Sequence, residues 1–428
     1  MKTHDVFGIV PEIRSQSYVD RGDLDKTLET YLARSLHVAM KGPSKCGKSW
    51  LRQKSLSNAL IVQCRHNKPY TDIYVNALSL LNIRLEIQRT ESDTVKGSLI
   101  ATSEVGAALI AKVSGTVELV AEKGDTTQTQ CVGHDVSDLK FIADIIKQSG
   151  RRLVIEDFHY MKIEDRKAFA FDLKTLWDYG LFVVIVGVWS GSNLLLSLNP
   201  DLTGRVHEIS ITWANNDLRE IIIKGSSELN IEVTDSVIAR LVSLAYSNAG
   251  ILQQLTLLSL DDAGIVEGIS GLLVNRQQLN DIKHVEAAAM LYVDQLNAVY
   301  QQFAKRVSAG IRTRQRATGI YAHTLAVIME ASDDELIQGL CARTICDRAQ
   351  VRQSRIQYSN LKAILSKIES LQLDDRGCGV IISYNEATEE VAIVDRQLLL
   401  YRKYSTIKWP WEDIITEAEA KGGEIEAD

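Results

Sequence analysis

The chain has 428 residues and a formal net charge of −7; 45% of its residues are hydrophobic and 24% are charged. This length leaves room for two or three domains, and the composition is that of an ordinary globular protein with a sizeable core. The acidic balance excludes a strongly basic protein that coats nucleic acid, although it leaves a local basic patch open. The six cysteines are scattered without a C-x-x-C pair, which is typical of reduced thiols rather than of a disulfide framework or a zinc site.

The sequence gives no sign of a membrane segment. Its longest apolar run, residues 181–189, is too short to cross a bilayer, and the first residues carry no signal-peptide pattern. We therefore expect a cytoplasmic protein that does not enter a membrane.

The first informative stretch is a glycine-rich loop near the N-terminus. It reads Gly42, Pro43, Ser44, Lys45, Cys46, Gly47, Lys48, Ser49, with the G-x-x-x-x-G-K-S spacing of a phosphate-binding P-loop. A buried strand at 36–40 precedes the loop and a helix follows from Ser49, which is the context that this motif requires. The motif predicts that the loop residues and Trp50 bind a nucleotide through inward-pointing N–H groups, with Lys48 on the β- and γ-phosphates and Ser49 on Mg²⁺.

Strands and helices then alternate along the chain. After an amphipathic helix at 24–33 and the P-loop, we expect strands at 59–64, 153–155, 181–188 and 206–211, and helices at 72–81, 135–149 and 169–179. This alternation predicts a parallel sheet covered on both faces, with its ligand at the carboxyl ends of the strands. Residues 97–134 break the pattern, because they are rich in Ala, Val, Thr and Gly and alternate in places. They predict a β-hairpin insertion.

Two acidic residues follow the third predicted strand. The apolar residues 153–155 lead into Glu156 and Asp157, a Walker B pattern. We assign Glu156 to Mg²⁺ and Asp157 to activation of the attacking water. The order is the reverse of the commoner Asp-Glu, and the shorter Asp side chain favours slow hydrolysis. The alternative is a plain acidic turn after a core strand.

The second half of the chain is predicted to be mainly helical. Helices are expected at 217–229, 234–245 and 250–260, and at 281–306 with Asn280 as its cap; this region, 215–305, is interpreted as a helical lid behind a nucleotide domain at 1–214. Helices at 321–331, 333–347 and 359–371 (with Ser359 as cap) and a hairpin at 380–394 predict a winged helix-turn-helix over 306–410. Residues 411–428 are expected to form a polar tail that frays from Lys421 onward.

Together these features resemble the AAA+ ATPases, in particular the branch with a C-terminal winged helix that includes replication initiators and the related STAND signalling ATPases. Residues 18–21 are similar to the box before the P-loop, residues 247–250 to the glycine turn of the lid, and residues 199–205 to the segment that carries the arginine finger. The resemblance implies a five-stranded parallel sheet, bound ATP and Mg²⁺, and a homo-oligomer in which Arg205 touches the γ-phosphate of the next subunit. The Walker motifs also resemble those of uncharacterised bacterial ATPases, some of them suspected of anti-phage roles.

The sequence departs from this family at two places. Lys45 stands where many members have glycine, and Ile251, Leu252 and Gln253 stand where a second sensor arginine is expected. The missing arginine puts tight coupling between hydrolysis and lid motion in doubt. It favours a nucleotide switch over a fast motor.

Three functions remain at this stage. The first is an ATP-dependent switch that oligomerises and signals to a partner effector, with anti-phage defence as one setting. The second is a DNA-binding regulator or loader, motivated by the winged helix and by arginines at 306, 312, 314, 316, 352 and 355 but opposed by the acidic net charge. The third is a small-molecule kinase, which ranks last because no separate acceptor site is recognisable.

Overall fold

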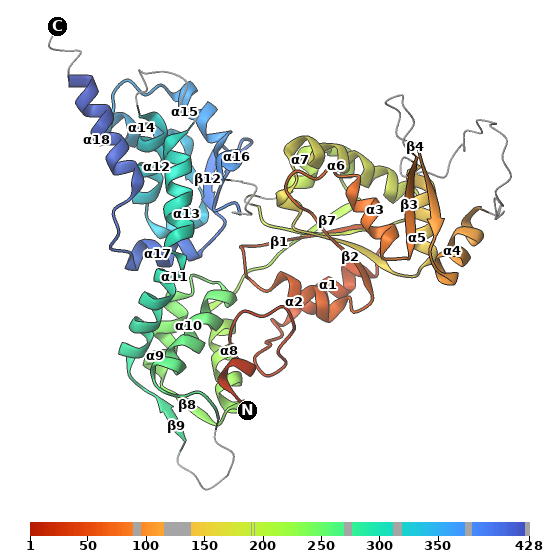
Figure 1. Cartoon of the computed structure of the whole chain (residues 1–428). Coiled ribbons are helices and arrows are strands. Elements are labelled where there is room, and N and C mark those ends of the chain that lie inside the picture. Colours follow the sequence, from red (N-terminus) through yellow and green to blue (C-terminus); the bar gives the residue numbers. More distant parts are fainter. Residues whose placement is uncertain are drawn as a thin grey trace.

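The protein is described by a computed structural model that covers residues 1–88, 96–114, 138–189, 191, 193–268, 276–310, 319–372 and 379–423. Its centre is a parallel sheet of five strands, drawn in Figure 1: β1 (His37–Lys41), β2 (Ala59–Gln63), β5 (Arg152–Glu156), β6 (Val184–Gly187) and β7 (Val206–Ser210). The strand order is β2-β5-β6-β1-β7, and every neighbouring pair is parallel. The expected fold class, an α/β domain with a five-stranded parallel sheet, is confirmed.

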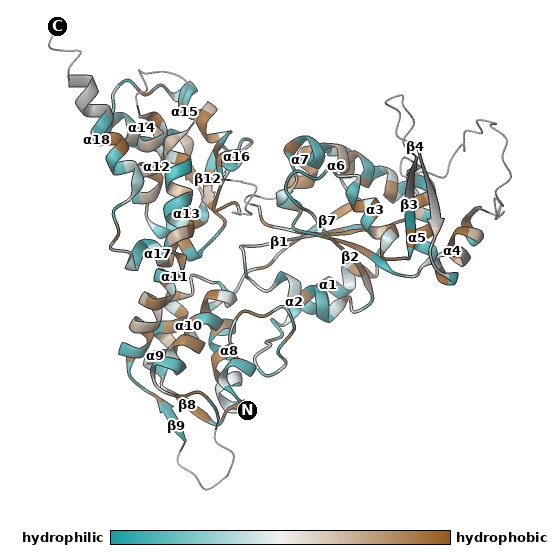
Figure 2. Cartoon of the chain, viewed as in Figure 1, coloured by the Kyte–Doolittle hydropathy of each residue, from teal (hydrophilic) through white to brown (hydrophobic). Residues whose placement is uncertain are grey.

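Alternating residues of the strands pack into separate cores on the two faces of the sheet. One core joins Val38, Met40 and Val154 to the helices α1 (Asp23–Leu32) and α2 (Lys48–Ser55). The other core joins the residues that alternate with these, such as Ala39, Leu153 and Ile155, to four helices. These are α3 (Asp72–Ser79), α5 (Leu139–Gln148), α6 (Ile163–Asp178) and α7 (Leu194–Leu198). Figure 2 shows the hydrophobic residues along the strands between these two helical layers. A sheet buried on both faces explains why the strands read as continuous apolar runs.

A helical region follows the sheet. It contains α8 (Asn215–Glu228), α9 (Asp235–Leu244), α10 (Ala249–Asp262) and the long helix α11 (Ile282–Ala309), with β8 (Ile231–Val233) paired to β9 (Gln277–Leu279). The N-terminal 3₁₀ helix η1 (Thr3–Asp5) packs on α10. In Figure 1, α11 runs from this region up to the C-terminal helices and contacts both. Within the described residues, no helix is both long and apolar enough to cross a membrane.

The C-terminal region combines helices with a small antiparallel sheet. Its elements are α12 (Ile320–Glu330), α13 (Asp333–Gln338), β10 (Leu340–Cys341), α14 (Ala342–Arg352), α15 (Tyr358–Leu365), α16 (Ile368–Gln372), β11 (Ile382–Asn385), β12 (Glu390–Ile393), α17 (Gln397–Tyr404) and α18 (Pro410–Gly423). The sheet order is β10-β12-β11, and β11 and β12 form the hairpin that was predicted. The assignment of this region as a winged helix-turn-helix stays a prediction.

The hairpin expected at 97–134 lies earlier in the chain. Strand β3 (Ile83–Gln88) pairs with β4 (Lys96–Ala101), and helix α4 (Glu104–Ser114) follows directly. The Gly106 N–H donates to the Ser103 hydroxyl in the first turn of this helix, a local bond that favours helix over strand. The alternating stretch at 117–122 lies outside the described residues.

Several helix boundaries also differ from the sequence predictions. The helix expected at 333–347 is divided, because Gly339 has a φ of +118° and the next two residues pair with β12. The helix expected at 359–371 is divided into α15 and α16, with Gln357 rather than Ser359 at the N-cap. Asp281, not Asn280, caps α11 through a bond from the Lys283 N–H.

The segment expected to be a polar tail is mostly helical. Residues 410–423 form α18, which packs against α11 and α12. Trp411 is 5% exposed and stacks on Trp409 with ring centroids 4.5 Å apart. Burial of the Trp411 indole, together with its stacking on the partly buried Trp409, stabilises the helix against its neighbours. The residues after 423 lie outside the described part of the chain.

We predict that His37 makes the stability of the sheet depend on pH. Its Nδ1 accepts the Val183 N–H (2.9 Å) and its Nε2 donates to the Leu173 carbonyl (2.9 Å), so the ring is neutral in the fold, and burial lowers its pKa to about 4. The unfolded chain, with a pKa near ~6.5, therefore binds the extra proton first as the pH falls. The free energy of unfolding should drop by about 1 kcal/mol from this group between about pH 7.5 and about pH 5.5.

Urea unfolding of the wild type and of His37→Gln across this pH range tests the prediction. The variant should be less stable at neutral pH, and its deficit should shrink as the pH falls. A deficit that stays constant over the whole range contradicts the proposed neutral state of His37.

Candidate functional site

The P-loop connects the carboxyl end of β1 to the first turn of α2. Gly47 has a φ of +89° and is the N-cap of α2, so a glycine is required there for an unstrained turn. Lys45 also has a positive φ, +61°, which is unfavourable for a residue with a Cβ by roughly 1–2 kcal/mol. The departure from glycine noted at this position therefore places a strained residue in the middle of the loop.

Three consecutive carbonyl oxygens of the loop are bonded by donors from elsewhere in the chain. The donors are Asn248 Nδ2 to Ser44 (2.7 Å), the Gly250 N–H to Lys45 (3.0 Å) and Trp213 Nε1 to Cys46 (2.8 Å). In a trans peptide the C=O of one residue and the N–H of the next point in opposite directions. The N–H groups of Lys45, Cys46 and Gly47 are therefore turned away from these donors, and none has an acceptor within the described residues. Such a run of free N–H groups is a concave anion site.

The cationic and hydroxyl groups predicted to meet the phosphates lie beside this loop. Lys48 Nζ donates to the carbonyls of Gly42 (3.0 Å) and Pro43 (2.6 Å), which are neutral acceptors that a phosphate can replace. Ser49 is in the first turn of α2, where the positive end of the helix dipole favours an anion. Lys48 and Ser49 line the same cavity.

That cavity has a volume of about 430 Å³, within the roughly 300–1,000 Å³ usual for ligand pockets. Its lining combines polar groups of the P-loop, Asp157 and His159 with the side chains of Val10, Tyr18, Val19, Trp50 and Ile221. This combination suits a molecule that carries both a phosphate chain and a flat base. The predicted nucleotide-binding residues Ser44 to Trp50 all line this space; Gly42 and Pro43 contribute the carbonyls that hold Lys48.

The two acidic residues after β5 have different surroundings. Glu156 is buried, and its Oε1 accepts from both Nε and Nη2 of Arg52 at 3.0 Å, so its charge is compensated by α2. Asp157 has a φ of +59° and lines the P-loop cavity. Burial raises the pKa of Asp157 and the Glu156 charge raises it further, whereas Lys48 opposes the shift. A partly buried carboxylate of this kind would be stabilised by a cation, and Asp157 lines the same cavity as Ser49, so the geometry favours Asp157 over Glu156 as the carboxylate that would hold Mg²⁺.

Arg205 lies at the amino ends of the sheet strands, whereas the P-loop lies at their carboxyl ends. It directly precedes β7, and its carbonyl accepts the His37 N–H (2.8 Å) where β1 begins, whereas the P-loop follows the end of β1. Its guanidinium stands 4.8 Å from the Trp177 ring centre and donates to the Asp201 carbonyl. Arg205 thus does not meet the P-loop within the described chain. Its predicted role as an arginine finger requires the nucleotide of a second copy.

Sequence reasoning missed Trp213 and noted Arg21 as part of the box before the P-loop, residues 18–21. The Arg21 guanidinium stacks 4.1 Å from the Trp213 ring centre, both line the cavity, and burial lowers the pKa of Arg21. Trp213 follows the last sheet strand at its carboxyl end, a position that the parallel topology marks as near the ligand. Gln253, at the place of the absent sensor arginine, instead accepts the Gly8 N–H (3.2 Å) and donates to Ser17 Oγ (3.1 Å). It anchors the N-terminal segment that closes the cavity.

No protein-family model matches the chain, and no curated protein sequence matches it. Among solved structures it is similar to the Orc1 protein of Aeropyrum pernix in complex with DNA, at 13% identity and a TM-score of 0.38 over 91% of this chain and 93% of that one. It is also similar to the RuvB Holliday junction branch migration motor of Thermotoga maritima, at 11% identity and a TM-score of 0.36 over 91% and 96% of the two chains. A STAND protein with a tetratricopeptide repeat sensor from Pyrococcus horikoshii is 11% identical, with a TM-score of 0.37 over 97% of this chain and 45% of that one. TM-scores this low carry no inference about function, and the sheet topology above identifies the fold by itself.

We predict that Trp213→Phe weakens nucleotide binding by roughly three- to tenfold. The change removes the donor to the Cys46 carbonyl but keeps an aromatic ring for Arg21, so the peptide unit before Gly47 loses one constraint on its orientation. Isothermal titration with a non-hydrolysable ATP analogue and Mg²⁺ measures the effect. Trp177→Phe is the matched control, because the Trp177 indole bonds the Ser35 carbonyl (2.9 Å) and does not line the cavity. Equal affinities of the two variants would contradict the role given to Trp213.

Proposed function

We propose that the chain binds ATP with Mg²⁺ and works as a slow ATPase switch. The observation that carries this proposal is a clasp formed by Ser44 and Lys45 of the P-loop with Val394 and Gln397 of the C-terminal region. The Ser44 N–H donates to the Val394 carbonyl (3.2 Å), and Lys45 Nζ donates to Gln397 Oε1 (2.8 Å). The residues that would receive the nucleotide are therefore the same ones that hold the C-terminal region.

The clasp is part of a wider contact between the two halves of the molecule. Arg396 donates to the carbonyls of Tyr246 (2.6 Å) and Ser247 (3.3 Å), just before α10. Gln397 is 3% exposed, and it also accepts from Tyr292 and donates to Asp395 Oδ1 (3.0 Å), so its amide is held in one orientation. A side chain fixed this firmly gives Lys45 a defined partner.

A second contact lies beside the Walker B segment. Val188, Val380 and Val394 form a small apolar cluster between the end of β6 and the C-terminal sheet. Arg166 donates to the His159 carbonyl (2.8 Å) and stands 3.8 Å from Glu369 of α16. The C-terminal region thus touches the P-loop directly and also residues beside the Walker B segment.

The proposed switch follows from these shared groups. A phosphate chain in the loop offers Lys45 and Lys48 an anionic partner that is stronger than the neutral oxygens they hold now. Each hydrogen bond that is exchanged contributes about 0.5–1.5 kcal/mol, so a few of them suffice to shift an equilibrium between two arrangements. Nucleotide binding would then release the C-terminal region, and loss of the γ-phosphate would allow it to return.

The chain's own residues also support a slow reaction. Lys48 would neutralise charge on the phosphates, and Ser49 and Asp157 would hold Mg²⁺, which supplies charge stabilisation in phosphoryl transfer. Because Arg52 occupies Glu156, one carboxylate remains to serve both the metal ion and the attacking water. Self-association through Arg205 is part of the proposal. The partner effector and an anti-phage role rest on the resemblance of the Walker motifs alone.

The second candidate function, DNA binding, is supported by the helices α12, α14 and α15 together with the three-stranded sheet, a set of elements that suits a winged helix. The exposed arginines of this region are engaged by neighbours: Arg343 with Asp347, Arg348 with Glu335, Arg352 with Glu330, and Arg355 with Gln353. Carboxylates beside three of the four reduce the positive potential that phosphate contacts require. Arg312, Arg314 and Arg316 lie outside the described residues. We therefore rank the switch above DNA binding; a salt-sensitive shift of duplex DNA would reverse that order.

We predict that opening the clasp tightens nucleotide binding. Gln397→Ala removes the acceptor of Lys45 and should lower the Kd for a non-hydrolysable ATP analogue by about fivefold, because less free energy is spent in separating the two regions. Isothermal titration measures the change. Gln301→Ala is the control, since Gln301 bonds Tyr401 of α17 (3.0 Å) away from the P-loop and should leave the Kd unaltered. Lys48→Ala is the negative control, since this variant should not bind the ATP analogue. Unchanged or weaker binding by Gln397→Ala would argue against the switch.

We further predict that the ATP-bound protein assembles through Arg205. Asp157→Asn should retain ATP and lose turnover, and this variant should form an oligomer on addition of ATP and Mg²⁺. Adding Arg205→Ala should leave the ATP affinity of the single chain within about twofold and abolish the assembly. Light scattering after size-exclusion chromatography reads out the mass. If the variant with Arg205→Ala still forms the oligomer, Arg205 is not an arginine finger. If Asp157→Asn stays monomeric at high protein concentration with ATP, the proposed self-association is wrong.

A further inference from the structure

Strand β2 forms an edge of the central sheet, and one side of its backbone is open. The Cys64 N–H donates to the Glu156 carbonyl (2.9 Å), so by the two-residue repeat of a strand Leu60 and Val62 also face β5. The N–H and C=O groups of Ile61 and Gln63 therefore point away from the sheet. Within the described residues these groups have no hydrogen-bond partner.

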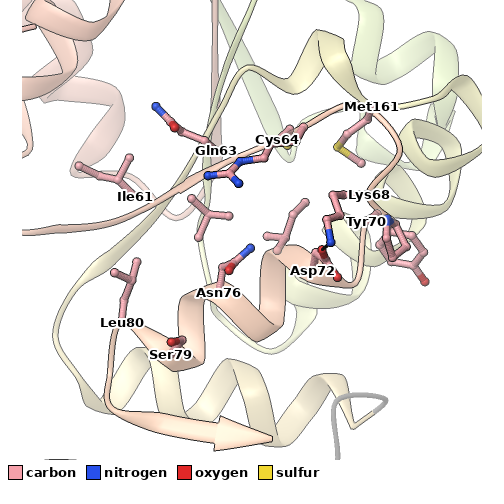
Figure 3. Close-up of a pocket in the computed structure, with 14 residues that line it drawn as sticks. Ile61, Gln63, Cys64, Lys68, Tyr70, Asp72, Asn76, Ser79, Leu80 and Met161 are labelled. Atoms are coloured by element: carbon pink, nitrogen blue, oxygen red, sulfur yellow. Dashed lines mark ion pairs between the residues drawn. The ribbon is translucent and has the colours of Figure 1, made fainter. Parts of the chain in front are cut away.

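A groove runs along this open edge. Figure 3 shows Ile61 and Gln63 of β2 on one wall and Asn76, Ser79 and Leu80, from α3 and its end, on the other, with a space between them. The cavity measures about 430 Å³ and is separate from the P-loop cavity, with which it shares no lining residue. Ile61 is 37% exposed and Leu80 is 46% exposed, so both walls offer apolar surface to an incoming chain.

The end of the groove carries a positive charge. Arg65 and Lys68 follow β2, and both are exposed. Lys68 stands 3.8 Å from Asp72 and is compensated by it, whereas the Arg65 guanidinium has no partner among the described residues. The nearby Asp165 accepts the Tyr70 N–H (3.2 Å) and belongs to α6. Among the described residues that line the groove, Arg65 therefore carries the one charge that no neighbouring charge compensates.

We propose that this groove binds an extended segment of a partner protein, which pairs with β2 as a sixth strand and places an acidic side chain against Arg65. A groove between an edge strand and a helix, with free backbone groups on the strand, is the arrangement used for peptide recognition by strand addition. Backbone bonds to Ile61 and Gln63 supply affinity, and Arg65 supplies selectivity for an acidic sequence. Because α3 forms the other wall of the groove, the occupant that we propose is a single extended segment rather than the sheet edge of a second copy.

The test uses the full chain and a fluorescein-labelled peptide of alternating valine and threonine that ends in two aspartates. Fluorescence anisotropy should give saturable binding to the wild type. Ile61→Pro removes the outward N–H and is tolerated on an edge strand, so it should weaken binding by at least about tenfold. Ile61→Thr keeps both the N–H and the β-branch and should bind within about twofold of the wild type. Equal binding by the proline and threonine variants would overturn the proposal.

A charge exchange tests the acidic preference. Arg65→Glu should weaken binding of the aspartate-ended peptide by about tenfold and improve binding of the same peptide ended by two lysines. Thermal melting and binding of the ATP analogue should be unaffected in all of these variants, which separates failure of the groove from failure of the nucleotide site. Absence of saturable binding by the wild type, or self-association through β2 that Ile61→Pro abolishes, would each overturn the assignment of a peptide ligand.

Discussion

The structure depends on the orientation of three peptide units in the P-loop. Asn248, Gly250 and Trp213 bond the carbonyl oxygens of Ser44, Lys45 and Cys46, and planarity of the peptide then directs the following N–H groups to the other side. None of these donors belongs to the loop, so its anion-binding shape is imposed by the helical region and by Trp213, which follows the last strand. The N–H groups of Lys45, Cys46 and Gly47 are thereby already oriented when phosphate arrives, even though the lysine side chains must exchange partners, and preorganisation is what gives such dipoles their strength.

The sheet topology determines which parts of the chain reach this loop. Because β6 lies between β1 and β5, the P-loop and the Walker B segment leave the same edge of the sheet with one strand between them. The C-terminal region occupies that edge through Val394 and Gln397 on one side and Glu369 on the other. The open backbone of β2 and the surroundings of Arg205 are outside this contact. The proposed nucleotide chemistry, subunit contact and strand addition would therefore use different surfaces of one domain.

Much of the architecture could be predicted from the sequence, because apolar runs and turn residues report burial directly. The five strands and the P-loop were predicted within a residue or two at most ends, since a buried parallel strand has an uninterrupted apolar signature. The helix at 104–114 was mistaken for a hairpin because Ala, Val and Gly populate both structures. Trp411 shows the complementary error: one buried indole ordered a segment whose average composition is polar.

The roles within the site were harder to predict, because they depend on side-chain direction at the ends of strands. Glu156 and Asp157 are adjacent in sequence, and only the positive φ of Asp157 and the position of Arg52 separate a buried ion pair from a residue in the cavity. Arg52 lies far from Glu156 in the chain, and no spacing rule connects them. The bonds of Trp213 and Gln397 to the loop are likewise long-range contacts that have no local signature.

Lys45, in the middle of the P-loop, can be compared with the glycine that many similar loops have at this position. Glycine at position 45 would relax the backbone and would still let the loop curl around phosphate, but it would offer no ammonium group to Gln397. The strained backbone at Lys45 is therefore what provides the hydrogen bond to Gln397, on which the proposed switch depends. We would expect a relative with glycine at this position to bind nucleotide without any change in the contact between its P-loop and its C-terminal region.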